Sequence, residues 1–126
     1  MPLDDLRIVI LNERESGRLS EVPPNLHDEI RGHVASLQEQ VYGSADPFSA
    51  KAQTLIEEVK AVREIARDIF RIRSRKILSL ALVQVEAEAM DRDELKKMLP
   101  VEREMFDGII RELGKGKAAL SGQVPY

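Results

Sequence analysis

The sequence has no cysteine, and only 4% of its 126 residues are aromatic. Without cysteine the chain can form neither a disulfide framework nor a thiolate metal site. It also lacks a long apolar run, since residues 77–85 reach about half of the roughly 18 apolar residues of a membrane-spanning helix, and Ser79 and Gln84 interrupt them. The acidic start, Met1 to Asp5, is unlike a signal peptide. These absences favour a cytoplasmic protein that does not contact a membrane.

Residues typical of catalysis are also scarce. The only two histidines, His27 and His33, are not at a spacing that suits two ligands of one metal ion. Glu29 precedes His33 at i−4, whereas helical di-iron sites use Glu at i−3. The segment from Gly114 to Lys117 lacks the spacing and the preceding strand of a phosphate-binding loop. We therefore expect no catalytic, metal-binding or cofactor-binding residue and no enzymatic activity. A metal-carboxylate enzyme is the least favoured of the three functions that the sequence suggests.

Helical periodicity dominates the first part of the chain. Apolar residues near the N-terminus recur at helical spacing and predict a helix that ends at Ser16 and Gly17, since glycine commonly closes a helix. Asn25 is a suitable N-cap for a second helix. Asp46 is expected to cap a third helix with Pro47 in its first turn. The apolar stripe of the second helix consists of Leu26, Ile30, Val34, Leu37 and Val41.

One long helix is expected in the middle of the chain. Residues 48–85 contain neither proline nor glycine, and a helix of that length would measure about 57 Å, more than a small domain needs to cover its own core. Asp91 and Glu94 have the spacing of a capping box and predict a short helix. Pro100 then begins a last helix, which we expect to fray over residues 114–117. The fold class is therefore all-α, with about five helices in a domain over residues 1–120 and a linker over 121–126.

The long helix combines positive charge with a wide apolar surface. The whole chain has a net charge of −3, but residues 63–76 hold six basic against two acidic residues, a net charge of +4. Residues 1–47 hold four basic against nine acidic residues, a net charge of −5, which is unlike a basic nucleic-acid-binding module. Beyond residue 69 the apolar surface widens, so more than one side of the helix should be buried. The candidate subunit-interface residues are Ile69, Phe70, Ile72, Arg73, Ile77 and Leu80.

The arginines of this helix fall into two groups. Arg73 lies on the apolar stripe and should either extend to water or meet a buried carboxylate of a partner. Four others recur at every fourth position, and three interpretations remain open for them: a solvated face with ion pairs such as Asp68 with Arg71 or Glu64 with Arg67, a salt-bridged subunit interface, or phosphate contacts. These candidate partner or phosphate contacts are Arg63, Arg67, Arg71 and Arg75.

Three segments resemble a known family. Residues 11–24, Leu-Asn-Glu-Arg-Glu-Ser-Gly-Arg-Leu-Ser-Glu-Val-Pro-Pro, resemble the first helix and its exit in archaeal GINS replication subunits. Residues 65–82 resemble the long Arg-rich helix of these subunits, and residues 98–106 resemble the turn into their last helix. The order of the elements agrees across essentially the whole chain, and the resemblance is to the class with a helical domain first and a β domain second. The chain ends where the linker to that β domain would begin, so we expect a stub without the β domain.

The resemblance also implies a function. A GINS subunit is a non-catalytic part of the replication fork, associated with the nucleoid, which links the MCM helicase to a RecJ-like protein and to a polymerase or primase. It assembles with itself or with a second GINS subunit into a dimer or tetramer, through helical domains. The alternative from another class is a nucleic-acid-binding helical regulator that uses the arginines at every fourth position. We expect at most weak DNA binding, because the basic stretch offers only Phe70 for base stacking.

Overall fold

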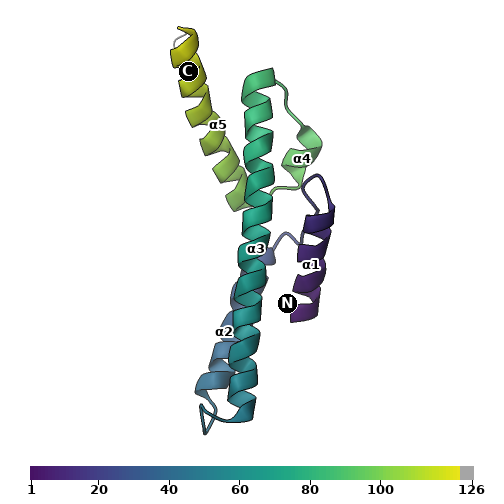
Figure 1. The fold of residues 1–126 in the computed structure, drawn as a ribbon, viewed down its shortest axis with the longest axis vertical. Helices are drawn as coiled ribbons and strands as arrows, with labels where there is room; N and C mark the ends of the chain where they lie inside the picture. The colour runs from purple at the N-terminus through teal and green to yellow at the C-terminus, as the bar shows by residue number, and fades with distance from the viewer. Residues whose placement is uncertain (123–126) are drawn as a thin grey trace. The chain divides into compact units, whose positions relative to one another are not determined.

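The computed structural model describes residues 1–122 of the chain, and within that range it contains five helices and no strand. The helices are α1 (Leu3–Glu15), α2 (Leu26–Tyr42), α3 (Ala50–Ala87), α4 (Arg92–Lys96) and α5 (Pro100–Ser121), as Figure 1 shows. The all-α class with one long helix is confirmed. None of the described helices combines the length and the apolar character that a membrane span requires.

Several helix ends agree with the local sequence signals. Helix α1 stops at Glu15, just before the expected Ser16 and Gly17. The carboxylate of Asp91 accepts a hydrogen bond from the backbone N–H of Glu94, at 3.2 Å, so the expected cap of α4 is present. Helix α5 begins at Pro100, where the missing N–H of proline costs nothing. Local capping chemistry therefore explains where these helices begin and end.

Two expected caps are wrong in detail. The side chain of Asn25 donates to Glu29 Oε1 and does not cap α2. Asp46 accepts the N–H of Phe48 in a turn before α3, whereas Ser49 Oγ accepts the N–H of Ala52 and caps the helix. A polar residue closer to the helix thus provides the cap of α3.

The last helix is longer than expected. It continues through Gly114 and Gly116 and ends only at Ser121, after which Gly122 adopts the left-handed conformation that closes it. The expected fraying over residues 114–117 is therefore wrong. Each glycine costs about 1 kcal/mol in a helix interior, and the buried Ala118 beyond them offsets part of this cost by packing. Of the expected linker, Ser121 belongs to α5, and residues 123–126 lie outside the described residues.

The chain forms two compact units, which share the continuous helix α3. The first unit contains residues 1–15 and 22–71. Its core is made of apolar side chains from α1, α2 and the N-terminal half of α3, namely Leu6, Ile10, Leu26, Leu37, Ala52, Val59, Val62 and Ile69. Within this unit, Arg14 on α1 forms an ion pair with Asp68 on α3, with Nη2 and Oδ2 3.2 Å apart.

Among the described residues, the second unit contains residues 16–21 and 72–122. Its core combines α3, α4, α5 and the short connection between α1 and α2, with Leu19, Ile77, Ala81, Leu95 and Phe106 buried together. Burial of such aliphatic and aromatic side chains contributes about 1.5–3 kcal/mol each relative to exposure. The connection at residues 16–21 is thus part of a folded core, although it belongs to no helix.

Candidate interaction surface and the Arg73 cluster

Arg73 is the centre of a buried polar cluster in the second unit. It is only 1% exposed, and its Nε and Nη2 atoms donate to the two carboxylate oxygens of Glu102, at 2.7 Å each. Its Nη1 donates to the carbonyl of Ser20 at 2.9 Å, and Nη2 also donates to the carbonyl of Lys97 at 3.0 Å. A buried guanidinium needs such partners, because an unpaired buried charge is very costly.

The carboxylate that pairs with Arg73 belongs to the same chain. It comes from α5 and not from another subunit. Glu102 has a second task, since its Oε1 accepts the N–H of Leu99 at 2.9 Å and so satisfies a donor at the start of α5. The expected place of Arg73 in a subunit interface is therefore wrong, because its hydrogen-bonding groups are engaged inside the fold.

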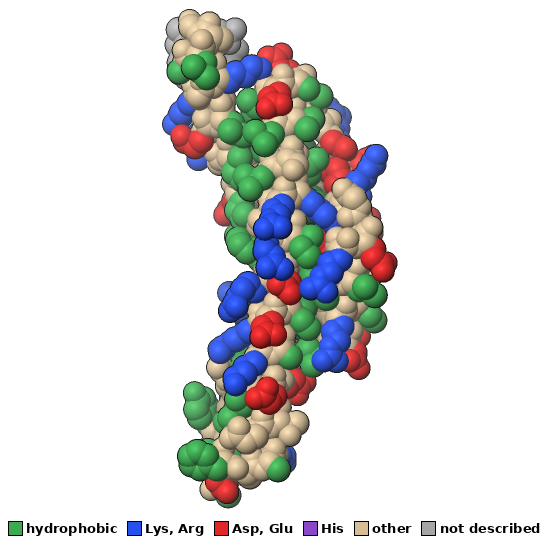
Figure 2. Space-filling model, in the orientation of Figure 1, with side chains coloured by type: hydrophobic (Ala, Val, Ile, Leu, Met, Phe, Trp, Pro, Cys, Tyr) green, Lys and Arg blue, Asp and Glu red, His purple; other side chains and the backbone are tan. Residues whose placement is uncertain are grey.

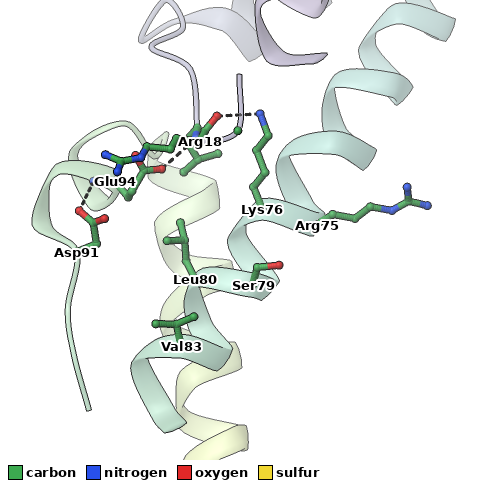
Figure 3. A pocket seen from close by; sticks show the side chains of 10 residues that line it. Arg18, Arg75, Lys76, Ser79, Leu80, Val83, Asp91 and Glu94 are labelled. Carbon is green, nitrogen blue, oxygen red and sulfur yellow. Dashed lines mark hydrogen bonds between the residues drawn. The ribbon is translucent and has the colours of Figure 1, made fainter. Parts of the chain in front are cut away.

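Hydrogen bonds from side chains of α3 and α4 hold the connection at residues 16–21 within the second unit. Lys76 Nζ donates to the carbonyl of Arg18 at 2.8 Å, and the N–H of Leu19 donates to Glu94 Oε2 at 2.9 Å (Figure 3). Arg73 also donates to the carbonyl of Ser20. Side chains from α3 and α4 thus satisfy backbone groups of a segment that has no secondary structure of its own, as burial requires.

The other candidate interface residues divide by exposure. Ile69 and Ile77 are buried in the cores of the two units, so they are not available to a partner in this fold. Ile72 is half-buried, and Leu80 is half-buried against the core of the second unit. Phe70 is 61% exposed and is therefore the one candidate of this set that presents most of its side chain to solvent.

A different set of α3 residues forms the exposed apolar surface. Leu78 and Leu82 are 46% and 44% exposed, although they follow directly after the fully buried Ile77 and Ala81. Residues four apart lie on one helix face, so the two leucines form an adjacent pair. Figure 2 shows hydrophobic side chains over the C-terminal half of α3. The sequence placed this pair in the widened apolar surface, but the spacing did not reveal which of its residues the chain leaves uncovered.

The four arginines at every fourth position are all exposed. Arg71 forms an ion pair with Asp68, with Nη2 and Oδ1 3.0 Å apart, as one of the open interpretations expected. Arg63, Arg67 and Arg75 have no ion pair or side-chain hydrogen bond among residues 1–122. Lys and Arg side chains are visible along the middle of α3 in Figure 2. The pairing of Glu64 with Arg67 does not form within the described part of the chain.

His33 lies beside an acidic side chain of the first unit. His33 Nε2 lies 3.6 Å from Glu58 Oε1 within the first unit, and it has no hydrogen-bond partner there. Among residues 1–122, no group of three or more His, Cys, Asp or Glu side chains is arranged to hold a metal ion.

Comparison with known proteins identifies no relative. No protein-family model matches this chain, and neither does any curated protein or any solved structure. A functional assignment therefore depends on the residues and their geometry.

Proposed function

We propose that this chain is a non-catalytic assembly subunit of the GINS type, acting at the replication fork. In this role it binds itself or a second GINS subunit in a dimer or tetramer. The assembly links the MCM helicase with a RecJ-like protein and with a polymerase or primase, in the cytoplasm at the nucleoid. The specific family rests on the resemblance of residues 11–24, 65–82 and 98–106, and the general role as an assembly protein rests on the surface described next.

The exposed apolar pair on α3 is the observation that carries the assembly role. Leu78 and Leu82 lie on a helix that already buries Ile77 and Ala81 in its own core, so α3 is apolar on more sides than its own chain covers. Exposed apolar residues that cluster on one face are typical of protein-protein contact surfaces. Phe70, eight residues before Leu78 on the same helix, adds a large exposed aromatic side chain. Aromatic residues are enriched in interface cores.

The buried ionic groups also favour binding over chemistry. Arg73 and Glu102 bond to each other and to backbone groups, so their polar atoms have structural partners. Groups that act in catalysis need access to a substrate, and neither of these two has it at 1% and 6% exposure. The geometry of this cluster therefore supports a structural task for it.

Light scattering on the purified chain, alone and mixed with candidate GINS subunits, tests the proposal. We expect a dimer or tetramer at tens of micromolar, and we expect Leu82→Glu to reduce the assembled fraction while the helical circular dichroism is unchanged. Val101→Glu is the matched control, because Val101 is an apolar residue with 48% exposure that lies on α5 and not on α3. It should leave the assembled fraction unchanged. A monomer in every mixture would refute the assembly role. Assembly without capture of an MCM helicase or a RecJ-like protein would refute the GINS assignment alone.

A nucleic-acid-binding helical regulator is the second candidate. It is favoured by one observation, the exposure of Arg63, Arg67 and Arg75 without partners among residues 1–122. The net charge of −3 counts against it, since non-specific nucleic-acid binding depends on net positive charge at the contact face.

A further inference from the structure

The second unit contains a surface pocket between α3 and the segment that leads into α4. Its volume is about 350 Å³, near the lower end of the roughly 300–1,000 Å³ range of ligand sites. Figure 3 shows Leu80 and Val83 projecting from α3 toward the segment that carries Asp91. Arg18 and Lys76 lie at one end of the pocket. The lining thus combines an apolar floor with a basic end.

The carboxylates of the lining are already engaged. Glu94 accepts the N–H of Leu19 at one oxygen and the Nζ of Lys97 at the other, at 2.9 and 3.0 Å. Asp91 accepts the N–H of Glu94. These bonds are internal to the fold, and each carboxylate therefore contributes to holding the wall of the pocket.

Two arginines of the lining differ from Glu94, which pairs with Lys97, because they have no partner of opposite charge within the described part of the chain. The guanidinium groups of Arg18 and Arg75 have no ion pair or hydrogen bond among residues 1–122. Arg75 extends outward from the rim in Figure 3, and its flexible stem can bring the charge to a bound group. Ser79, also in the lining, has a hydroxyl without a partner among the described residues. The pocket therefore offers a ligand two cations and a hydroxyl.

The floor requires an apolar group in the same ligand. Val83 is 56% exposed, and Leu80 remains half-buried beside it. Covering this surface removes apolar area from water, which favours binding at roughly 25 cal/mol per Å². No aromatic side chain lines the pocket, so nucleic-acid bases have nothing on which to stack. Phosphate alone would leave Leu80 and Val83 uncovered.

We propose that this pocket binds a short acidic peptide segment of a partner protein. One aliphatic side chain of the segment covers Leu80 and Val83, and a neighbouring carboxylate pairs with Arg18 or Arg75. The complementarity of charge between the rim and the carboxylate, and of apolar area between the floor and the aliphatic side chain, selects this partner. The inference goes beyond the proposed function, because it needs neither self-assembly nor the GINS assignment.

Fluorescence anisotropy with synthetic peptides on the intact chain tests this proposal. The probe is a fluorescein-labelled peptide in which leucine alternates with aspartate. One control peptide has asparagine for every aspartate, and another has serine for every leucine. We expect saturable binding of the probe, weakened by at least tenfold in both controls, and weakened by added salt because the rim pairs are exposed.

Four variants locate the binding. Val83→Asp places a repulsive carboxylate on the floor, and we expect it to weaken binding by at least tenfold. Arg75→Glu should weaken binding and reduce its salt dependence, as rim charges do. The matched controls are Arg63→Glu, an exposed arginine of α3 outside the pocket, and Val101→Asp, an exposed valine of α5 outside it. Both controls should bind the probe as the unaltered chain does.

Three results with the peptides and the variants would overturn the proposal. They are no saturable binding up to millimolar peptide, equal binding of the asparagine peptide, and equal losses in the control variants. Displacement of the probe by single-stranded oligothymidylate at lower concentrations than by unlabelled peptide would also overturn it, in favour of nucleic acid. Light scattering on the same samples separates this test from the assembly test, because Arg75→Glu leaves Leu78 and Leu82 unchanged.

Discussion

Arg73 on α3 and Glu102 on α5 form a bidentate ion pair that is almost completely buried, with both N–O distances at 2.7 Å. The pair joins two helices, and through the carbonyl of Ser20 it also holds the connection between α1 and α2. A buried ion pair contributes little to the free energy of unfolding when compared with a well-packed apolar pair. Removal of one partner, however, leaves an unpaired charge in the core. Replacement of one partner alone therefore leaves the other as an uncompensated buried charge, which destabilises the fold.

Replacement of Arg73 alone should destabilise the protein strongly. Arg73→Met removes the partner of Glu102 and the donors to two carbonyls, and we expect a loss of about 3–5 kcal/mol in the free energy of unfolding, measured by urea denaturation. Arg103→Met is the control. Arg103 forms an exposed ion pair with Asp107 on α5, so its loss should cost under about 1 kcal/mol. Equal losses in the two variants would show that the buried ion pair contributes no more to the free energy of unfolding than an exposed one.

Neighbouring residues of α3 should differ sharply in their tolerance to truncation. Ile77 is fully buried and Leu78 is 46% exposed. Ile77→Ala should therefore cost about 2–5 kcal/mol of stability through the lost transfer energy and the cavity. Leu78→Ala should cost clearly less in the same thermal or urea unfolding experiment, and it should weaken assembly instead. A larger loss of stability for Leu78→Ala than for Ile77→Ala would contradict the burial of Ile77 and the exposure of Leu78.

The exposure of Phe70 favours a role for its side chain in assembly over a role in the core. A buried Phe70 would lose about 3–5 kcal/mol on truncation to alanine. At 61% exposure, Phe70→Ala should leave the melting temperature of the isolated chain nearly unchanged and should reduce the assembled fraction in light scattering. Ile69→Ala, one residue earlier and buried, is the contrasting variant. A large fall in melting temperature for both variants would contradict this distinction.

Glu88, just after α3, is a position where stability can be gained. It is the one non-glycine residue among residues 1–122 with a positive φ, 53°, a conformation that costs L-residues about 1–2 kcal/mol. Glu88→Gly should therefore raise the free energy of unfolding by about 0.5–1 kcal/mol. Its contact with Lys117, at 3.4 Å and well exposed, offsets little of this gain. Glu86→Gly, inside the last turn of α3, should instead lower stability, and a matching loss at Glu88 would disprove the strain argument.

DNA binding should be weak, and its salt dependence separates the two proposed functions. If Arg63 and Arg67 held phosphates, duplex affinity would fall by about 0.9 log units per log unit of added salt for each contact. The double variant Arg63→Gln with Arg67→Gln would then reduce this salt dependence. We expect instead no tight binding near an ionic strength of about 0.15 M. Arg111→Gln, on the exposed face of α5, is the control for a general charge effect. Submicromolar affinity that only the double variant abolishes would favour the nucleic-acid-binding regulator.

Local chemistry is what the sequence by itself determined. The absence of proline and glycine from residues 48–85 was enough to predict the long helix α3, because nothing in the segment interrupts the backbone hydrogen bonds. The cap at Asp91 and the start at Pro100 were likewise predictable, since capping acts over three or four residues. The longer reach of α5 was not, because packing around Ala118 outweighs two glycines only once the core exists.

Only the tertiary structure decided the roles of the α3 side chains. Helical spacing placed Arg73 on an apolar stripe, but the stripe cannot say whether its carboxylate partner comes from another subunit or from Glu102, 29 residues further along the chain. The same spacing grouped Ile77, Leu78 and Leu82 in one wide apolar surface. Packing of α4, α5 and Leu19 covers Ile77 and leaves the two leucines exposed, because the few elements of this chain cover only part of the circumference of a long helix.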